Sequence, residues 1–290
     1  MSLTTSQKSL QRDWPPIIDL AAFYGHEFPA KEMLIREMRR ACESYGFFQI
    51  INHGIPSDLQ QSIFQQSKDL FGLPSEVKER YSLDTNKSDQ GYERLRSQSF
   101  EKRTRGDLKE GIYLGKNLPL DDPYVVQGKF GQGANSIYVA LSSLVEGILQ
   151  ILVRTLDLDE HTFDEFCEHP IAILRLLHYP TQGPDASELE RGIGAHTDFG
   201  AVTILLQDET GGLQVWNNMS SEWVDRTNDR YFSTLRRRYR TPFFFCGNPD
   251  YSISCLLSFQ GPNQGAKYPP VTVGEWMTGR YADTYGNIEG

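Results

Sequence analysis

The sequence contains no histidine after His196, although almost a third of the chain follows that residue. Cysteine is also scarce, and the four residues Cys42, Cys167, Cys246 and Cys255 stand far apart with no paired spacing. Neither a disulfide framework nor a zinc knuckle is therefore indicated, and we expect four reduced thiols.

The sequence also has few positively charged residues and no long apolar run. The chain has 29 Lys and Arg residues against 38 Asp and Glu residues, which gives a net charge of -9. Sequence-independent nucleic-acid binding needs an excess of cations to neutralise phosphates, so no nucleic-acid partner is expected. The sequence shows no apolar signal core and no membrane-spanning apolar run, which predicts a cytoplasmic protein without membrane association. A small molecule is the expected partner, and nothing indicates a protein partner.

The bulk composition favours a globular protein with a sizeable core. At 290 residues the chain is long enough for one large domain or two small ones. The hydrophobic fraction of 39% is ordinary, and the aromatic fraction of 12% favours a β-rich protein with a pocket.

Hydrophobic periodicity predicts helices around one or two strands in the first third and strands after residue 170. Helices are expected over residues 31–45, from residue 57, and over 135–156, and a mobile polar loop over 83–107. Strands are expected over residues 47–51, 171–179, 194–207, 213–216, 222–225 and 241–246.

One short motif indicates a chemistry. Residues 194–207 read as a strand, and a strand alternates its faces, so His196 and Asp198 are predicted to point at the same place. An imidazole and a carboxylate that converge supply two of the three ligands of the two-His, one-carboxylate site of non-haem Fe(II) oxygenases. The simpler alternative is a hydrogen-bonded His–Asp pair in a turn.

Several blocks in order resemble the isopenicillin N synthase-like family of Fe(II)- and 2-oxoglutarate-dependent dioxygenases, over most of the chain. The blocks are Ile17-Ile-Asp-Leu, residues 41–56, Phe71-Gly-Leu-Pro, Asp107-Leu-Lys-Glu-Gly, Leu174-Arg-Leu-Leu-His-Tyr-Pro and Gly194-Ala-His-Thr-Asp-Phe-Gly. The resemblance implies an α+β fold with a mainly β core, a double-stranded β-helix (jelly roll) flanked by helices. It implies an N-terminal dioxygenase-type region over 14–125, a long helix and connection over 126–170, the jelly-roll core over 171–262, and a C-terminal segment over 263–290.

The same resemblance implies the cofactor Fe(II), the cosubstrate 2-oxoglutarate and their ligands. His196 and Asp198 match the first two iron ligands. Tyr179 and Arg238 match positions that contact 2-oxoglutarate, with Arg238 pairing with its distal carboxylate, and Arg240 replaces a serine that adds a hydrogen bond. The alternatives are a packed aromatic at Tyr179 and a solvated basic run at the arginines.

The chain departs from the family pattern in two places. Arg236 stands at the position of the distal iron-binding histidine, and a guanidinium has no lone pair to offer a metal. Asp225 runs directly into Arg226, where the family has a glycine-bearing turn and an apolar strand, and a few residues are also missing between Arg237 and Arg238. The sequence therefore predicts a jelly roll that lacks one core strand.

Three interpretations of function follow. The first is a divergent or internally truncated dioxygenase that hydroxylates or desaturates a small organic molecule, for example in specialised metabolism. The second is a catalytically inactive jelly-roll protein that acts as a binding or regulatory protein. The third is an intact dioxygenase from which segments near Asp225 and Arg237 have been wrongly excised.

Overall fold

The computed structural model describes residues 15–85, 90–100, 106–115, 136–183, 191–218, 220–225, 237–256, 260 and 265–285. The chain forms two compact units whose segments alternate along the sequence. The first unit comprises residues 1–56, 143–163 and 211–232, and the second comprises residues 57–142, 164–210 and 233–290. The four sequence regions expected from the family resemblance stay a prediction.

The first unit contains two small two-stranded sheets. β1 (Ile17–Asp19) pairs in parallel with β2 (Gln49–Ile51), and α2 (Ala21–Tyr24) and α3 (Phe28–Ser44) lie between them in sequence. β7 (Gln214–Asn217) pairs in antiparallel fashion with β8 (Glu222–Asp225). These elements confirm the strands and the helix predicted for this part of the chain.

α3 forms where the apolar residues recur at helical spacing. Leu34, Met38 and Ala41 are its buried residues and lie on one face, as the i, i+4, i+7 pattern requires. The helix ends because Gly46 adopts a φ of 70° and its N–H donates to the carbonyl of Ala41, a conformation that glycine reaches without steric cost.

α7 (Ser136–Thr155) is the longest helix of the described residues and confirms the helix predicted for 135–156. Its length and apolar composition would suffice to cross a membrane, but 56% of the apolar window is buried inside the protein. The helix therefore has the character of a core helix. Tyr138 at its start donates a hydrogen bond to the carbonyl of Ala172 at 3.1 Å.

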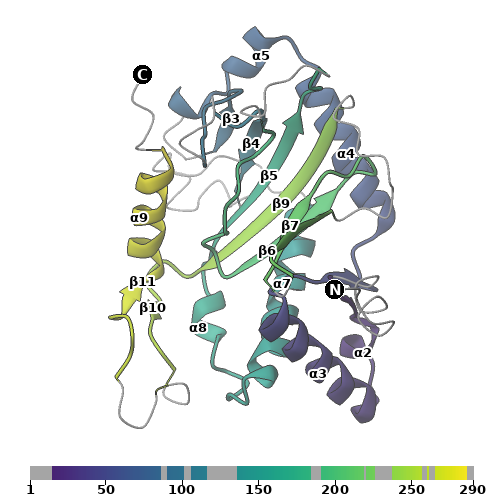
Figure 1. Cartoon of the computed structure of the whole chain (residues 1–290), viewed down its shortest axis with the longest axis vertical. Coiled ribbons are helices and arrows are strands. Elements are labelled where there is room, and N and C mark those ends of the chain that lie inside the picture. Colours follow the sequence, from purple (N-terminus) through teal and green to yellow (C-terminus); the bar gives the residue numbers. More distant parts are fainter. Residues whose placement is uncertain are drawn as a thin grey trace. The chain divides into compact units, whose positions relative to one another are not determined.

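The second unit is built on a five-stranded antiparallel sheet (Figure 1), in the order β3-β4-β5-β9-β6. The strands are β3 (Gly91–Glu93), β4 (Glu110–Leu114), β5 (Ile171–Tyr179), β6 (Val202–Gln207) and β9 (Arg238–Gly247). α4 (Ser57–Phe71) packs against β5 and β9. The other elements of the unit are α5 (Ser75–Glu79), η1 (Leu83–Thr85), α8 (Asp164–Cys167), β10 (Ser252–Ile253), β11 (Val271–Thr272) and α9 (Val273–Tyr285).

The core of this unit lies around β5 and β9, which are central and nearly fully buried. Leu174, Phe243 and Phe245 are completely inaccessible, and Phe243 meets the ring of Tyr138 edge to face at 5.2 Å. The ladder between β5 and β9 is interrupted opposite Thr241 and Pro242, because proline has no N–H to donate.

Two predictions made from the sequence are wrong in this unit. The polar segment 83–107 was expected to be a mobile loop, yet β3 lies within it, because the buried carboxylate of Glu93 pairs with Arg175 on β5 and replaces the apolar pattern of an ordinary strand. The strand expected from residue 194 begins only at Val202, where the ladder with β9 starts opposite Phe245. β9 ends two residues after Phe245, so residues 194–199 would find no partner on it.

A buried ion-pair network joins α5 to β3, β4 and β5. Glu110 accepts hydrogen bonds from Lys78 Nζ at 2.6 Å and from the hydroxyl of Tyr92 at 2.5 Å, and it lies 2.8 Å from His178 Nδ1. The ring of His178 is itself stacked between Phe71 and Tyr239. Burial alone would raise the pKa of Glu110, but the hydrogen bonds from His178, Lys78 and Tyr92 lower it to about 2.

Glu110→Gln should destabilise the fold by about 3 to 5 kcal/mol at neutral pH, because it leaves Lys78 buried without its counter-charge. The pKa of Glu110 is lowered from its ordinary 4.5 to about 2, so its ionisation stabilises the fold above pH 4.5, and this contribution is lost as the pH falls through 2. Urea unfolding of both proteins between pH 7 and pH 2.5 should show a stability difference that narrows below pH 4.5. A difference that stays constant with pH would contradict the network.

β6 is the last strand of the sheet that the described residues form, and Leu205 on it is 37% exposed. An edge strand with apolar side chains favours pairing with other chains, so we expect the purified protein to self-associate. Leu205→Lys should reduce this association, whereas Leu95→Lys, at a 43% exposed position in a turn, should not. Size-exclusion chromatography with light scattering measures the outcome. A monomeric wild-type protein would show that this edge is covered.

Candidate active site

His196 and Asp198 lie in an irregular turn before β6, and not in the strand on which the sequence argument relied. Their side chains nevertheless converge, with His196 Nε2 at 3.5 Å from Asp198 Oδ1. His196 Nδ1 donates to the carbonyl of Gly194 at 2.8 Å. This bond places the Nδ1 proton on the backbone side of the ring, so Nε2 is the nitrogen that faces the carboxylate and that a cation would bind once it has lost its proton.

The electrostatics of the pair favour the charged forms of both side chains. Burial alone lowers the pKa of His196, but the bonds to Asp198 and to the Gly194 carbonyl raise it overall. Burial alone raises the pKa of Asp198, but bonds from His196 and from the hydroxyl of Thr203 lower it overall. A divalent cation placed between Nε2 and Oδ1 would displace a proton and take over the same attraction.

An aromatic ring covers one face of the imidazole. Phe100 is stacked on His196 with the ring centroids 4.3 Å apart and the planes inclined by 16°. The side chains of His196 and Asp198 are 28% and 37% exposed. The pair is therefore fixed in orientation and still open to a solute.

The other two predicted site residues lie at the paired ends of β5 and β9. Tyr179 is the register partner of Arg238, and Leu177 is the partner of Arg240. The guanidinium carbons of Arg238 and Arg240 lie 5.4 and 5.2 Å from the centre of the Tyr179 ring. Two cations thus flank one buried phenol, an arrangement suited to a carboxylate.

Burial sets the protonation behaviour of this group. It raises the pKa of Tyr179, and it lowers the pKa of Arg238, with the charge of Arg240 acting in the same direction. The phenol therefore stays neutral at physiological pH, while an arginine stays charged even with a lowered pKa. Arg238 and Tyr179 therefore form a group that keeps its positive charge. Arg238 and Arg240 are only 6% exposed, which contradicts a solvated position for these two arginines.

Gly192 lies against Tyr179 and Arg238 and belongs to the segment that leads to His196. A Cβ at this position would lie 2.9 Å from Tyr179 Cδ1 and 3.3 Å from a terminal nitrogen of Arg238. Only glycine lets the backbone pass this close to both side chains. Because Gly192 precedes His196 by four residues, one short segment serves both groups.

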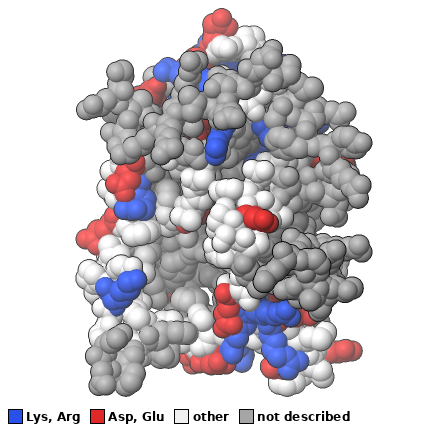
Figure 2. Space-filling model, in the orientation of Figure 1, with Lys and Arg blue, Asp and Glu red and all other residues white. Residues whose placement is uncertain are grey.

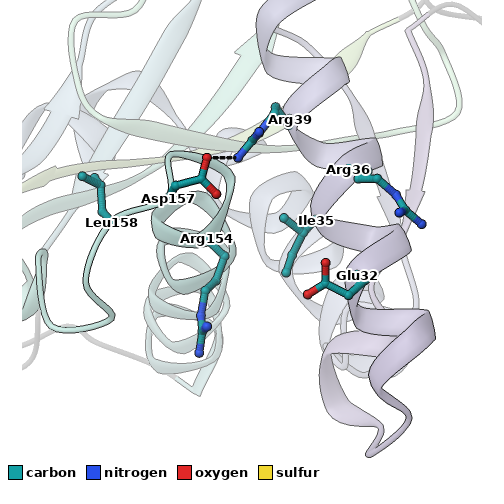
Figure 3. Close-up of a pocket in the computed structure, with 7 residues that line it drawn as sticks. All are labelled: Glu32, Ile35, Arg36, Arg39, Arg154, Asp157 and Leu158. Atoms are coloured by element: carbon teal, nitrogen blue, oxygen red, sulfur yellow. Dashed lines mark hydrogen bonds and ion pairs between the residues drawn. The ribbon is translucent and has the colours of Figure 1, made fainter. Parts of the chain in front are cut away.

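A separate pocket of about 300 Å³ lies in the first unit between α3 and the end of α7 (Figure 3). Its lining is mostly charged, and Arg39 pairs with Asp157 across it at 2.8 Å. None of the predicted site residues lines this pocket. On the face shown in Figure 2, basic side chains gather at the lower centre with acidic side chains beside them.

Comparison with known proteins decides the family. Residues 15–137 match the family described as the N-terminal region of non-haem dioxygenases in morphine synthesis, and residues 170–235 match the 2OG-Fe(II) oxygenase superfamily. The chain is 39% identical over 319 residues to the 2-oxoglutarate-Fe(II) type oxidoreductase hxnY of Emericella nidulans, covering 95% of this chain and 91% of that protein. It is 36% identical to the 2-oxoglutarate-dependent dioxygenase citB of Monascus ruber, covering 93% and 95%. The chain belongs to the 2-oxoglutarate- and Fe(II)-dependent dioxygenases.

Solved structures of similar proteins confirm the fold as a jelly roll with flanking helices. A full-length Neurospora crassa protein, solved in complex with alpha-KG, superposes with a TM-score of 0.78 at 21% identity, covering 92% of this chain and 95% of that one. The rice dioxygenase for auxin oxidation gives a TM-score of 0.70 at 19% identity, covering 92% and 95%. The relatives hxnY and citB are an oxidoreductase and a dioxygenase, which favours the enzyme over a non-catalytic binding protein.

The relatives also bear on the truncation. The alignment with hxnY spans 319 residues and therefore exceeds the 290 residues of this chain, so it contains positions at which this dioxygenase has no residue. Residues 226–236, where the sequence departs from the family pattern, lie outside the described residues, and so does Arg236. The loss of a core strand at that junction stays a prediction.

The family uses Fe(II) with 2-oxoglutarate, and the residues present fit this pair in part. The Nε2 lone pair of His196 and Asp198 Oδ1, 3.5 Å apart, suit two neighbouring positions of one cation. No group of three His, Cys, Asp or Glu residues among the described residues could complete a three-ligand site. Among the residues that the structure describes, the site therefore offers one imidazole and one carboxylate.

The sequence pattern predicted the four candidate site residues but not the residues that contact them. Asp107, Gly192 and Phe100 all contact the site. Asp107 lies in one of the blocks that resemble the family, but the resemblance gives it no role. Nothing in their local spacing reveals such contacts, because the partners are distant in sequence.

Proposed function

We propose that this chain binds Fe(II) through His196 and Asp198, binds 2-oxoglutarate through Arg238 and Tyr179, and oxidises a small organic molecule by hydroxylation or desaturation. The observation that carries the proposal is the approach of His196 Nε2 to Asp198 Oδ1 at 3.5 Å. A relative named clavatol oxidase, from Penicillium crustosum, is 32% identical, and the similar Neurospora crassa protein has been solved with thymine, which supports a small-molecule substrate. A cytoplasmic location stays a prediction.

When bound, the metal supplies the activation of O2 that amino-acid side chains cannot perform. The contribution of His196 is orientation, since its bond to the Gly194 carbonyl fixes both the tautomer and the ring plane. Asp198 contributes negative charge beside the imidazole, and the hydroxyl of Thr203 on β6 anchors its carboxylate to the sheet.

The arginines supply the anion site. Arg238 offers a planar fork that can pair with both oxygens of a carboxylate, and Tyr179, only 3% exposed, forms a dry surface beside it. Arg240 replaces the family's serine and adds a second positive charge near the same ring. The buried position strengthens both attractions, because it excludes the water that would screen them.

His196→Ala should weaken metal binding by about tenfold or more, because it removes the one imidazole among the two proposed ligands, and loss of even an outer-shell partner costs about 10- to 100-fold. Calorimetric titration with Mn(II), in the presence of 2-oxoglutarate, measures the affinity. His161→Ala, which removes a 74% exposed histidine, is the matched control and should bind as the wild type does. Equal affinities of all three proteins would refute the proposed metal site.

Arg238→Lys should weaken 2-oxoglutarate binding by about tenfold, because lysine keeps the charge but loses the bidentate fork, and a charge-assisted hydrogen bond contributes about 1.5 to 3 kcal/mol. Titration of the Mn(II)-loaded protein with 2-oxoglutarate measures the effect. Arg237→Lys, at a neighbouring exposed position, serves as the control. If both substitutions weaken binding equally, the effect is general electrostatics and Arg238 is not the anchor.

A further inference from the structure

Asp107 is a buried carboxylate that contacts the turn carrying His196. It is 1% exposed, and its Oδ1 accepts the backbone N–H of Gly194 at 3.0 Å. The next residue makes a second link, since the N–H of Leu108 donates to the carbonyl of Arg191 at 2.8 Å. Two hydrogen bonds, to Arg191 and Gly194, therefore attach the turn to the segment just before β4.

Gly194 connects Asp107 to the metal-binding imidazole. Its N–H is held by Asp107, and its carbonyl receives the Nδ1–H of His196 at 2.8 Å. A shift of Gly194 would move the acceptor that selects the tautomer of His196 and sets the ring plane. The position of His196 Nε2 opposite Asp198 thus depends on the Asp107 carboxylate, which acts on the ring through the backbone of Gly194.

Asp107 is in turn fixed from the other side. Lys109 is 2% exposed, and its Nζ lies 3.4 Å from Asp107 Oδ2 and donates to Gln98 Oε1 at 2.7 Å. The same Nζ lies 5.8 Å from the centre of the Phe100 ring, which covers the face of His196. Asp107 therefore holds the imidazole by hydrogen bonds through the backbone, Phe100 holds it by stacking on its ring, and Lys109 and Gln98 brace them.

We propose that Asp107 is a positioning residue of the metal centre, which acts through Gly194 to fix the tautomer and orientation of His196. The inference rests on the proposed metal-binding role of His196 and Asp198. A purely structural role would make Asp107 matter for stability only. A positioning role makes it matter for the histidine ring itself, with and without metal.

The first test uses Mn(II) affinity of the full chain. Asp107→Ala removes the acceptor for Gly194 and should weaken Mn(II) binding about 10- to 100-fold, the usual effect of losing an outer-shell partner. Asp107→Asn keeps a side-chain oxygen at the same place and should restore most of the affinity. Glu110→Gln is the matched control, because it breaks a nearby buried network in which Glu110 contacts Lys78, Tyr92 and His178 and no residue of the turn.

The second test needs no metal. At a pH high enough to keep the ring neutral, the imidazole ¹⁵N shifts of His196 in the metal-free protein should show the Nδ1–H tautomer in the wild type, Asp107→Asn and Glu110→Gln, and a mixture of tautomers in Asp107→Ala. Should Asp107→Ala fail to fold, Asp107→Ser takes its place, since its hydroxyl is shorter by one bond and cannot reach Gly194 without movement of the backbone.

The outcomes separate the two claims. Selective loss of Mn(II) affinity and of the tautomer in Asp107→Ala, with recovery in Asp107→Asn, supports the positioning role. Wild-type behaviour of Asp107→Ala, or equal losses in Glu110→Gln, overturns it while leaving the metal site intact. A wild-type protein that binds no Mn(II) yet shows the tautomer dependence would overturn the proposed function and retain only the contact between Asp107 and the turn.

Discussion

The hydrogen bond between His196 Nδ1 and the carbonyl of Gly194 determines what the site can do. It directs Nε2 to Asp198 as the ring nitrogen available to a metal once deprotonated, and a metal-binding histidine needs its other nitrogen held in this way. Without the bond, the pair would be an ordinary acid–base contact in a turn. The turn itself contributes no ladder hydrogen bonds, because β6 and β9 begin to pair only at Val202 and Phe245.

The rest of the second unit provides a rigid base for that turn, with buried ion pairs in place of part of the apolar core. Glu93 pairs with Arg175, and Glu110 pairs with Lys78, so that β3, β4 and β5 are joined by charges as well as by their ladders. Such pairs contribute little net stability compared with apolar packing, but breaking one is costly. They therefore favour a single arrangement of the strands, on which the spacing of Tyr179 and Arg238 depends.

Periodicity in the sequence predicted the elements whose burial is apolar. α3, α7 and β5 were found because their buried residues recur at helical spacing or form a continuous apolar run. β3 was missed because its buried Glu93 carries a charge. Residues 194–201 were wrongly assigned to a strand, since the start of β6 depends on where its partner β9 ends, and β9 is distant in sequence. His196 and Asp198 were predicted from residue type and spacing, although the turn and not strand alternation brings them together, while Asp107 and Gly192 required the three-dimensional contacts.

The central claim is that the metal site of this dioxygenase contains one imidazole. Pulsed electron paramagnetic resonance on the Mn(II)-loaded protein counts the directly bound histidine nitrogens through their ¹⁴N couplings. The account predicts the coupling of a single imidazole, which disappears in His196→Ala. Couplings from two imidazoles, or a coupling that persists without His196, would contradict it.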